Sequence, residues 1–277
     1  MKLSILAGRT VTTLLLCSVS VWTIAQSNNQ ASGYKPEVGQ EGKDVIWVPT
    51  PDDLVKKMLE VAEVTPKDYL IDLGSGDGRT VIAAAKIGAK ALGIEFNPEM
   101  VALSKKKAEE AGVKDKATFL QTDLFEYDLS KATVITMFLL PDINLRLRPK
   151  LLDLKPGTRI VSNTFTMGEW EPDYEVTTND ESSSWSTALM WIIPAKIEGT
   201  WELAAGQLEI RQDFQMFYGT LKNEKKPSTI SEGRITGDLV NFRIDGDSYT
   251  GKVAGNTITG TVTRNSTKTD WSAKLKE

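Results

Sequence analysis

A short apolar segment that runs directly into three closely spaced glycines is the feature that most constrains this fold. Residues 69–73 (YLIDL) have the composition of a buried strand, and Gly74, Gly76 and Gly78 follow before a helix-like stretch. Glycine permits the positive φ of a tight turn and lets a ligand approach the backbone. This order indicates a parallel sheet with a ligand site at the carboxyl end of a strand.

The neighbouring segments repeat the alternation of strand and helix. We expect helices at 51–64, 80–87 and 98–111, and strands at 69–73, 91–96, 117–122, 133–140 and 158–165. Segments 174–178 and 184–193 read as a terminal hairpin with an antiparallel member. The pattern predicts an α/β domain at 44–194 with a mostly parallel sheet.

The amino-acid pattern changes after residue 194. Residues 195–277 hold 9 of the 21 glycines, and GRITGD at 233–238 resembles GKVAGN at 251–256, 18 residues later. Short alternating strands between regular turns predict a small all-β domain, a meander or barrel of six or seven strands. Trp201 and Trp271 could plug such a barrel, although ordinary core packing is the simpler reading.

The N-terminus has the pattern of a secretory signal peptide. Lys2 and Arg9 precede the uncharged run 11–25, and Thr23 and Ala25 stand at the −3 and −1 positions of a cleavage site. The run is short for a membrane span, which needs about 20 residues. We expect a signal peptide at 1–25, a flexible leader at 26–43 and an exported protein, periplasmic or secreted. An uncleaved membrane anchor and a cytoplasmic N-terminal helix are the alternatives.

Composition excludes several kinds of chemistry. The chain has no histidine and a single cysteine, Cys17, which rules out Ser-His-Asp and Cys-His catalysis and histidine or multi-cysteine metal sites. We therefore expect no metal. Lys and Arg number 33 against 37 Asp and Glu, a net charge of −4, so no nucleic-acid partner is expected.

Three acidic residues end three successive predicted strands. Asp72 ends the first strand, Glu95 the second and Asp123 the third. A carboxylate at the second position can accept hydrogen bonds from ribose hydroxyls, and one at the third from an exocyclic amine such as that of adenine. The G-x-G-x-G spacing, with Asp72 and Asp77 nearby, suits a cationic ligand better than a pyrophosphate. An NAD-dependent oxidoreductase is thereby disfavoured.

The run DLGSGDGR at 72–79 resembles the first motif of class I SAM-dependent methyltransferases. A closer resemblance, over 47–173, is to exported bacterial members of unassigned substrate, and it rests on VPTP (48–51), FLLPDIN (138–144), PGTRIVS (156–162) and MGEWEPD (167–173). A more distant one is to small protein-lysine methyltransferases. The resemblance implies a Rossmann-like sheet and S-adenosylmethionine (SAM) as cofactor. It implies that the cofactor is bound by Asp72, Gly74, Ser75, Gly76, Asp77, Gly78, Glu95, Asp123, Leu124 and Thr50.

The resemblance places the methyl acceptor after the fourth strand. The substrate-side candidates are Phe138, Leu140, Pro141, Asp142 and Asn144. Asp142 or Asn144 could bind or deprotonate a nucleophile, or the segment is an ordinary helix start. No catalytic residue is identified, because positioning supplies much of the rate of methyl transfer from a sulfonium. Trp170 and Trp185 could line the acceptor pocket, but core packing is favoured.

Two departures from the family pattern matter. Asn163 stands where the exported relatives often have histidine. The helix expected after the fifth strand is absent, which leaves that face of the sheet thin or covered by the C-terminal domain. We predict a SAM-dependent methyltransferase acting on a protein lysine or a small molecule. The alternative is a non-catalytic adenosyl-ligand-binding domain that serves as a sensor or scaffold for the β domain.

Overall fold

The structure is a computed structural model that describes residues 33–178, 185–224 and 226–276. The expected signal peptide and residues 26–32 of the expected leader lie outside these residues. Among the helices that are described, none is long and apolar enough to cross a membrane.

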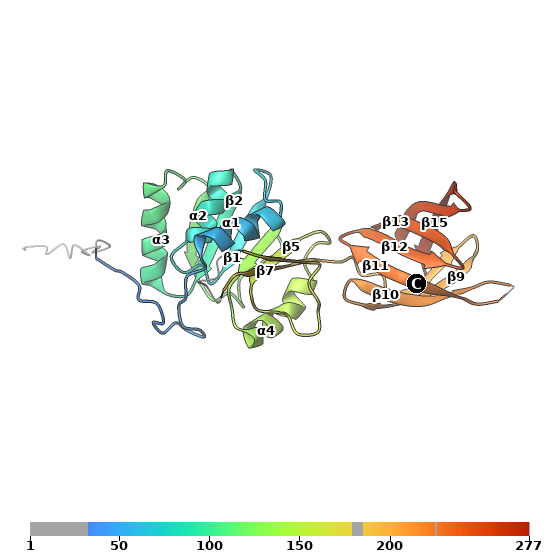
Figure 1. Cartoon of the computed structure of the whole chain (residues 1–277), viewed down its shortest axis with the longest axis horizontal. Coiled ribbons are helices and arrows are strands. Elements are labelled where there is room, and N and C mark those ends of the chain that lie inside the picture. Colours follow the sequence, from blue (N-terminus) through green and yellow to red (C-terminus); the bar gives the residue numbers. More distant parts are fainter. Residues whose placement is uncertain (1–32, 179–184, 225, 277) are drawn as a thin grey trace, which may run out of the picture. The chain divides into compact units, whose positions relative to one another are not determined.

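A seven-stranded sheet forms the first part of the chain (Figure 1). Its order is β3-β2-β1-β4-β5-β7-β6, in which β1 to β5 are parallel and β7 runs antiparallel to both β5 and β6. The strands are β1 (Tyr69–Leu73), β2 (Lys90–Glu95), β3 (Ala117–Gln121), β4 (Val134–Met137), β5 (Arg159–Asn163), β6 (Tyr174–Thr177) and β7 (Thr187–Ile192). The order reverses between β1 and β4, which is where open α/β sheets bind ligands.

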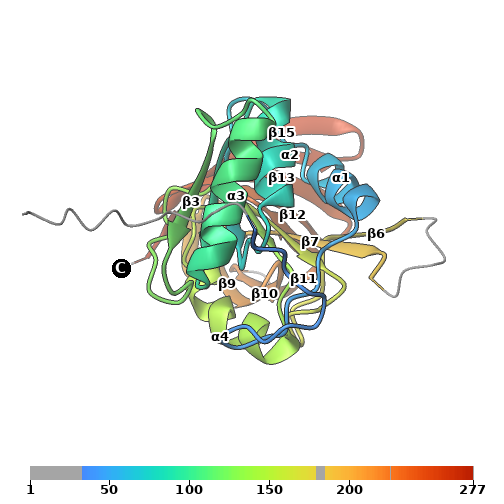
Figure 2. The same cartoon turned by 90° about the vertical axis from the view of Figure 1, so that its left-hand side faces the viewer.

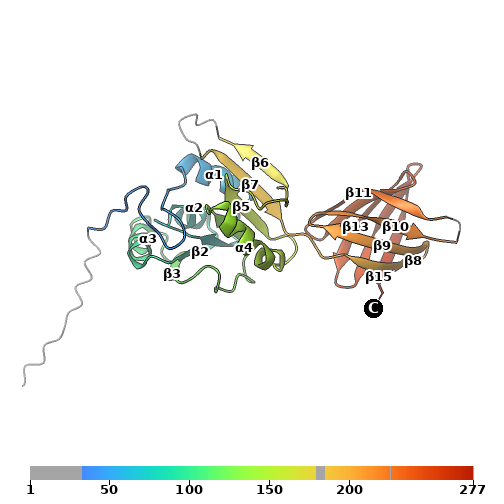
Figure 3. The same ribbon diagram turned by 90° about the horizontal axis from the view of Figure 1, so that it is seen from below.

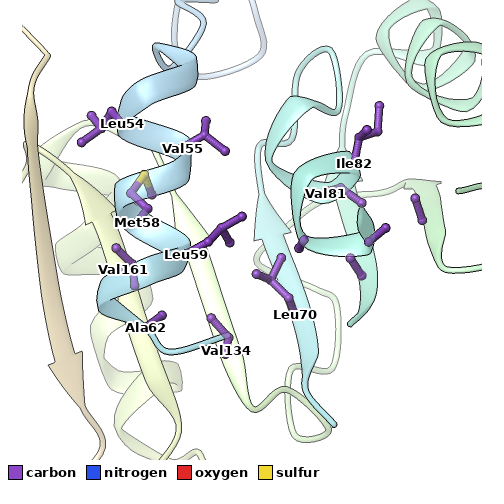
Figure 4. Packing of buried hydrophobic residues seen from close by; sticks show 14 of the residues in the cluster. Leu54, Val55, Met58, Leu59, Ala62, Leu70, Val81, Ile82, Val134 and Val161 are labelled. Carbon is purple, nitrogen blue, oxygen red and sulfur yellow. The ribbon is translucent and has the colours of Figure 1, made fainter. Parts of the chain in front are cut away.

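Alternate residues of the sheet build two separate cores. Helices α1 (Asp52–Val61), α2 (Arg79–Ile87) and α3 (Pro98–Glu110) cover one face, and α4 (Pro141–Leu152) lies on the other, as Figure 2 shows. On the first face, Leu54, Met58 and Leu59 of α1 lie against the strands that carry Val134 and Val161 (Figure 4). This alternation follows from the two-residue period of a strand.

The second part of the chain is a closed antiparallel barrel, with strand order β10-β11-β12-β13-β14-β15-β8-β9. Its strands are β8 (Gly199–Leu203), β9 (Gly206–Asp213), β10 (Met216–Lys222), β11 (Ser228–Thr236), β12 (Leu239–Ile244), β13 (Asp247–Ala254), β14 (Thr257–Arg264) and β15 (Thr267–Leu275). Apolar side chains fill the interior, with Trp201 fully buried and Trp271 packed against the same cluster. Figure 3 shows the barrel strands lying side by side. Both tryptophans are therefore core residues.

The predicted fold class is confirmed, but two details were wrong. The barrel has eight strands and not six or seven, because turns such as Phe214–Gln215 and Asn265–Ser266 lack glycine and were not recognised as turns. The fourth sheet strand ends at Met137 and not at residue 140, so the chain leaves the sheet at Phe138.

No helix lies between β5 and β6 in the described chain, as the sequence indicated. Phe214, from the turn between β9 and β10 of the barrel, packs instead against the core on the α4 face. The C-terminal domain therefore contributes this ring to the core on the α4 face.

Candidate active site

Asp72 is a buried carboxylate at the carboxyl end of β1. It is 7% exposed, and Thr136 of β4 donates a hydrogen bond to its Oδ1 over 2.6 Å. Burial raises its pKa to about 7, against the effect of Thr136, and the nearby carboxylates of Glu95 and Asp77 add to the rise. The described residues offer it no ion-pairing cation, so this site is built to receive one from a ligand.

The turn after β1 exposes backbone rather than side chains. Gly74, Gly76 and Gly78 all have positive φ, at 73°, 50° and 80°. At Gly78 a Cβ would come within 2.8 Å of Phe119 and Ser104, so only glycine fits there. Ser75 is buried, and its Oγ has no hydrogen-bond partner among the described residues. That oxygen is packed against Gly93 of β2, where an added Cβ would lie 2.5 Å from it.

The two other strand-end acids lie along the same edge. Glu95 accepts backbone hydrogen bonds from Gly76 (2.9 Å) and Asn97 (2.9 Å), one on each carboxylate oxygen, which fixes its orientation. Asp123 accepts from the backbone N–H of Phe125, and its other oxygen pairs with Lys43. The hydrogen bond from Lys43, with that from Phe125, holds the pKa of Asp123 below its usual range.

The chain before α1 forms the remaining wall of the cleft. We call residues 40–50 the strap, and they run between α3 and α4 (Figures 1 and 3). Backbone hydrogen bonds between Gln40 and Trp47 and between Gly42 and Val45 fold the strap into a tight loop. A Cβ on Gly76 would lie 2.6 Å from Nε1 of Trp47, so this indole rests on the glycine turn. Residues 40–43, expected to belong to a flexible leader, thus line the cleft.

Asp77 has a different environment from the other acids. Arg79 binds its two oxygens through Nε (3.0 Å) and Nη2 (2.9 Å), and Lys107 adds a bond of 2.7 Å. These hydrogen bonds outweigh the effect of burial and lower the pKa of Asp77. Arg79 also donates to the carbonyl of Thr50. Asp77 therefore ties the glycine turn to the strap.

The structure brings the predicted cofactor residues together around one cleft of about 1070 Å³, including the open space at its mouth. The predicted residues that line it are Asp72, Gly74, Ser75, Gly76, Asp77, Glu95, Asp123, Leu124 and Thr50. Gly78 lies behind them, at the N-cap of α2.

The substrate-side candidates divide into two groups. Phe138 lines the cleft, together with Leu139 and Ile143. Leu140, Pro141 and Asp142 are exposed at the start of α4, with Pro141 at its first position and Asp142 in its first turn. This is the ordinary helix start that the sequence left open.

Asn144 is fully buried behind the cleft. Its Nδ2 donates to the carbonyls of Phe165 (3.2 Å) and Thr166 (3.1 Å), so it holds the chain that follows β5. Trp170 is a fully buried core residue, whereas Trp185 packs against Phe138 and Phe165 at ring distances of 5.4 Å. Asn163, at the position of the missing histidine, is buried and donates to Oγ1 of Thr50 over 3.4 Å.

Sequence reasoning missed Lys43, Trp47 and Thr136. Trp47 directly precedes the VPTP motif, which is a signal that could have been used. Lys43 sits 80 residues before the acid it binds, and Thr136 sits 64 residues after Asp72, so no local pattern could have found them.

The residues present fit SAM. A buried carboxylate without a cationic partner in the described chain suits the ammonium of the methionine moiety, and the glycine turn gives room for it. Glu95 retains free lone pairs for ribose hydroxyls, and Asp123 lies one strand further along for the adenine amine.

Comparisons with known proteins agree with this geometry. Residues 72–174 match the family described as the ANTKMT methyltransferase domain. A protein-lysine N-methyltransferase of Saccharolobus islandicus is 43% identical over 152 residues, which are 54% of this chain and 94% of that protein. The adenine nucleotide translocase lysine N-methyltransferase of Mus musculus is 37% identical over 105 residues, 37% of this chain and 46% of that protein. The chain thus spans nearly all of the archaeal relative and less than half of the murine one.

A solved structure shares the fold. It is described as an RNA methyltransferase from Salinibacter ruber in complex with S-adenosylhomocysteine, and it is 50% identical, with a TM-score of 0.51 over 54% of this chain and 96% of that one. The product of methyl donation is bound in that relative, which agrees with a SAM site here and excludes the dinucleotide reading. The chain belongs to the class I SAM-dependent methyltransferases.

Proposed function

We propose that this enzyme methylates the side-chain amine of a protein lysine. The similarity to the archaeal lysine enzyme carries the proposal, because it extends over 94% of that protein. The apolar residues of the cleft support it. Met137, Phe138, Leu139 and Ile143 line the cleft, and none of them carries a charge.

An apolar wall suits a lysine in two ways. Its methylene groups can lie along apolar side chains while the nitrogen reaches forward. Desolvation also favours the neutral amine over the ammonium, and only the neutral amine has the lone pair needed for attack. SAM supplies an activated methyl group when bound. The amine lone pair forms the new N–C bond as the C–S bond breaks, the bonding electrons stay on sulfur, and a proton then leaves to solvent.

The chain's own residues position this reaction. Asp72 and the glycine turn hold the methionine moiety, Glu95 and Asp123 the adenosine moiety, and Phe138 faces the acceptor. Alignment of the two reactants accounts for much of the rate of such a displacement. No titratable side chain of the cleft is therefore assigned as a base.

An RNA acceptor is the second candidate, favoured by the description of the Salinibacter ruber relative. The two candidates can be separated by incubating the purified chain with radiolabelled SAM and either a lysine-rich protein or an RNA transcript. We expect label on the protein, a gain of one methyl mass on lysine by mass spectrometry, and none after the lysines have been blocked by acetylation. Label on RNA alone would overturn the lysine proposal.

The matched variants are Asp72→Asn, which should abolish labelling, and Asp115→Asn. Asp115 is an exposed acid of the loop between α3 and β3, far along the sequence from the strap. Equal loss in both variants would show that labelling does not depend on the SAM cleft.

We further propose that the chain is exported through residues 1–25. N-terminal sequencing of the protein recovered from the periplasm should begin at Gln26. Recovery of the intact N-terminus from the cytoplasm would contradict the proposal.

A further inference from the structure

One turn of the barrel packs against the core of the methyltransferase sheet. Phe214, between β9 and β10, stacks on Trp170 with ring centroids 5.6 Å apart and planes inclined by 13°. The guanidinium of Arg148, from α4, lies 5.4 Å from the centroid of the same ring. Phe214 of the barrel thus contacts both α4, which follows β4, and the chain that follows β5.

Gln215 completes this contact with hydrogen bonds. It is 4% exposed; its Oε1 accepts from Nε1 of Trp170 and its Nε2 donates to the carbonyl of Glu171, both at 2.8 Å. A buried amide is costly unless both of its ends are bound. Here the partners of both ends lie outside the barrel, so Gln215 is placed for this contact and not for barrel stability.

The segment that receives the contact is irregular. We call residues 163–171 the acceptor segment. Its Thr164 has a φ of 61°, a left-handed conformation that is rare for a β-branched residue and persists only where surrounding contacts enforce it. Three elements supply such contacts: Asn144 and Arg148 of α4 bind the carbonyls of residues 165–167, Trp191 of β7 binds that of Trp170, and the barrel binds Trp170 and Glu171.

The same segment reaches the cleft. Phe165 stacks on Phe138 at 5.9 Å, and Phe138 lines the cleft beside the glycine turn. The cofactor residues Asp72 and Glu95 lie on β1 and β2, and the acceptor segment meets the strap where Asn163 donates to Thr50 over 3.4 Å. The contacts of the barrel turn therefore run toward the acceptor and not toward Asp72 or Glu95.

We propose that Phe214 and Gln215 are positioning residues for methyl transfer. They hold the acceptor segment, so that Phe165 keeps Phe138 in place where the acceptor enters. This role rests on the proposed function in one respect, namely that the acceptor binds beside Phe138. The barrel is then a working part of the catalytic unit. Loss of the contact between the barrel turn and the acceptor segment should lower the rate of methyl transfer to the acceptor and leave cofactor affinity unchanged.

The test uses the full chain with Gln215→Ala and a matched control. The control is Gln207→Ala, a half-buried glutamine near the start of β9, the strand whose far end leads to the Phe214 turn. Hydrogen exchange of the acceptor segment, S-adenosylhomocysteine affinity by calorimetry and methyl-transfer kinetics are measured on both.

In Gln215→Ala we expect faster exchange at residues 163–171, roughly a tenfold loss of kcat/KM for the acceptor, and cofactor affinity within about twofold of wild type. Gln207→Ala should match wild type throughout. Unchanged exchange and kinetics in Gln215→Ala would overturn the proposal, and so would an equal loss of cofactor affinity, which would indicate a general structural defect.

Gln215→Glu provides a charged variant. It keeps an acceptor for Nε1 of Trp170 but buries a carboxylate against the carbonyl of Glu171, so exchange and rate should change at least as much as in Gln215→Ala. If Gln215→Ala does not fold, Phe214→Leu replaces it, with Tyr218→Leu on β10 as its exposed control. A wild-type chain that methylates no acceptor would count against the proposed function alone, because the exchange measurement decides this proposal by itself.

Discussion

At the scale of single residues, Asp72 carries the charge balance of the cleft. Its pKa of about 7 means that it is protonated in much of the free protein below that pH. A bound ammonium needs the carboxylate, so SAM affinity should weaken as the pH falls below 7, by up to about tenfold per unit. Calorimetry between pH 5.5 and 7.5 measures this dependence. A flat profile in the wild type, or a steep one in Asp72→Asn, would contradict the assignment.

Asp72 should lower the stability of the folded protein at a pH where its carboxyl group is charged. A carboxyl group whose pKa rises on folding stabilises the protein at low pH and loses that contribution as the pH climbs from 3.8 to 7. The full shift corresponds to roughly 4 kcal/mol. Asp72→Asn should therefore raise the free energy of unfolding at pH 8 by more than at pH 5, as measured by urea denaturation.

Asp68 is the matched control, with the opposite sign. Burial raises its pKa, but hydrogen bonds from Thr133 and Thr65 and the charge of Arg159 outweigh burial and lower it. Its contribution is present above 3.8 and disappears as the pH falls below that value. Asp68→Asn should lower stability at neutral pH by about 1–3 kcal/mol. Equal effects of the two variants would show that the hydrogen bonds and Arg159 do not set Asp68 apart from Asp72.

Lys43 competes for the acid assigned to adenine. Its Nζ pairs with Asp123 and lies 4.8 Å from the ring centroid of Phe96. Because an adenine amine would bind the same carboxylate, we expect SAM to displace this contact. We expect Lys43→Met to bind SAM a few-fold more tightly, with Lys35→Met as the exposed control. Weaker binding would show that Lys43 instead helps to hold the cofactor.

At the scale of elements, the turn after β1 needs glycine at position 78 for two reasons: the positive φ angle and the lack of space for a Cβ. Gly78→Ala meets both a φ of 80° and the Phe119 ring at 2.8 Å, whereas Gly112→Ala meets a φ of 70° with nothing within 4 Å. We expect a loss of about 3 kcal/mol for the first and about 1 kcal/mol for the second. Thermal denaturation compares them, and equal losses would show that the φ angle alone sets the cost.

The elements that could be predicted are those with a local signal. The two-residue and 3.6-residue periods placed β1 to β3 and α1 to α3 within a few residues, and the strand-end acids placed the cofactor side of the cleft. The strap escaped prediction because its polar sequence is typical of a linker, and its place depends on Trp47 resting on Gly76. The Phe214 turn was not predicted because its residues suit contacts with the other domain and are not typical of a turn.

At the scale of the whole molecule, residues from Tyr34 onward form one compact unit. Besides the Gln215 contact, Arg234 of β11 pairs with Asp173, whose side chain is 3% exposed and whose other oxygen accepts from the N–H of Ile192. Buried charge of this kind is costly once its partner is removed. Sheet and barrel are therefore linked by contacts that neither part satisfies alone, and we expect them to unfold in a single transition.

Arg234→Gln tests this linkage. Burial raises the pKa of Asp173 even with Arg234 and the Ile192 N–H in place, so the lone carboxylate of the variant should be most costly at high pH, where it stays charged. Because Arg234 is 42% exposed, we expect a loss of about 2 kcal/mol at pH 8 and less at pH 5. Calorimetry should show one transition at a lower temperature, and the double variant Asp173→Asn with Arg234→Gln should recover much of the loss, since no charge is then left buried. Two separate transitions already present in the wild type would contradict the linkage. A pH-independent loss that the double variant does not recover would place the cost in packing of the Arg234 side chain and not in the charge of Asp173.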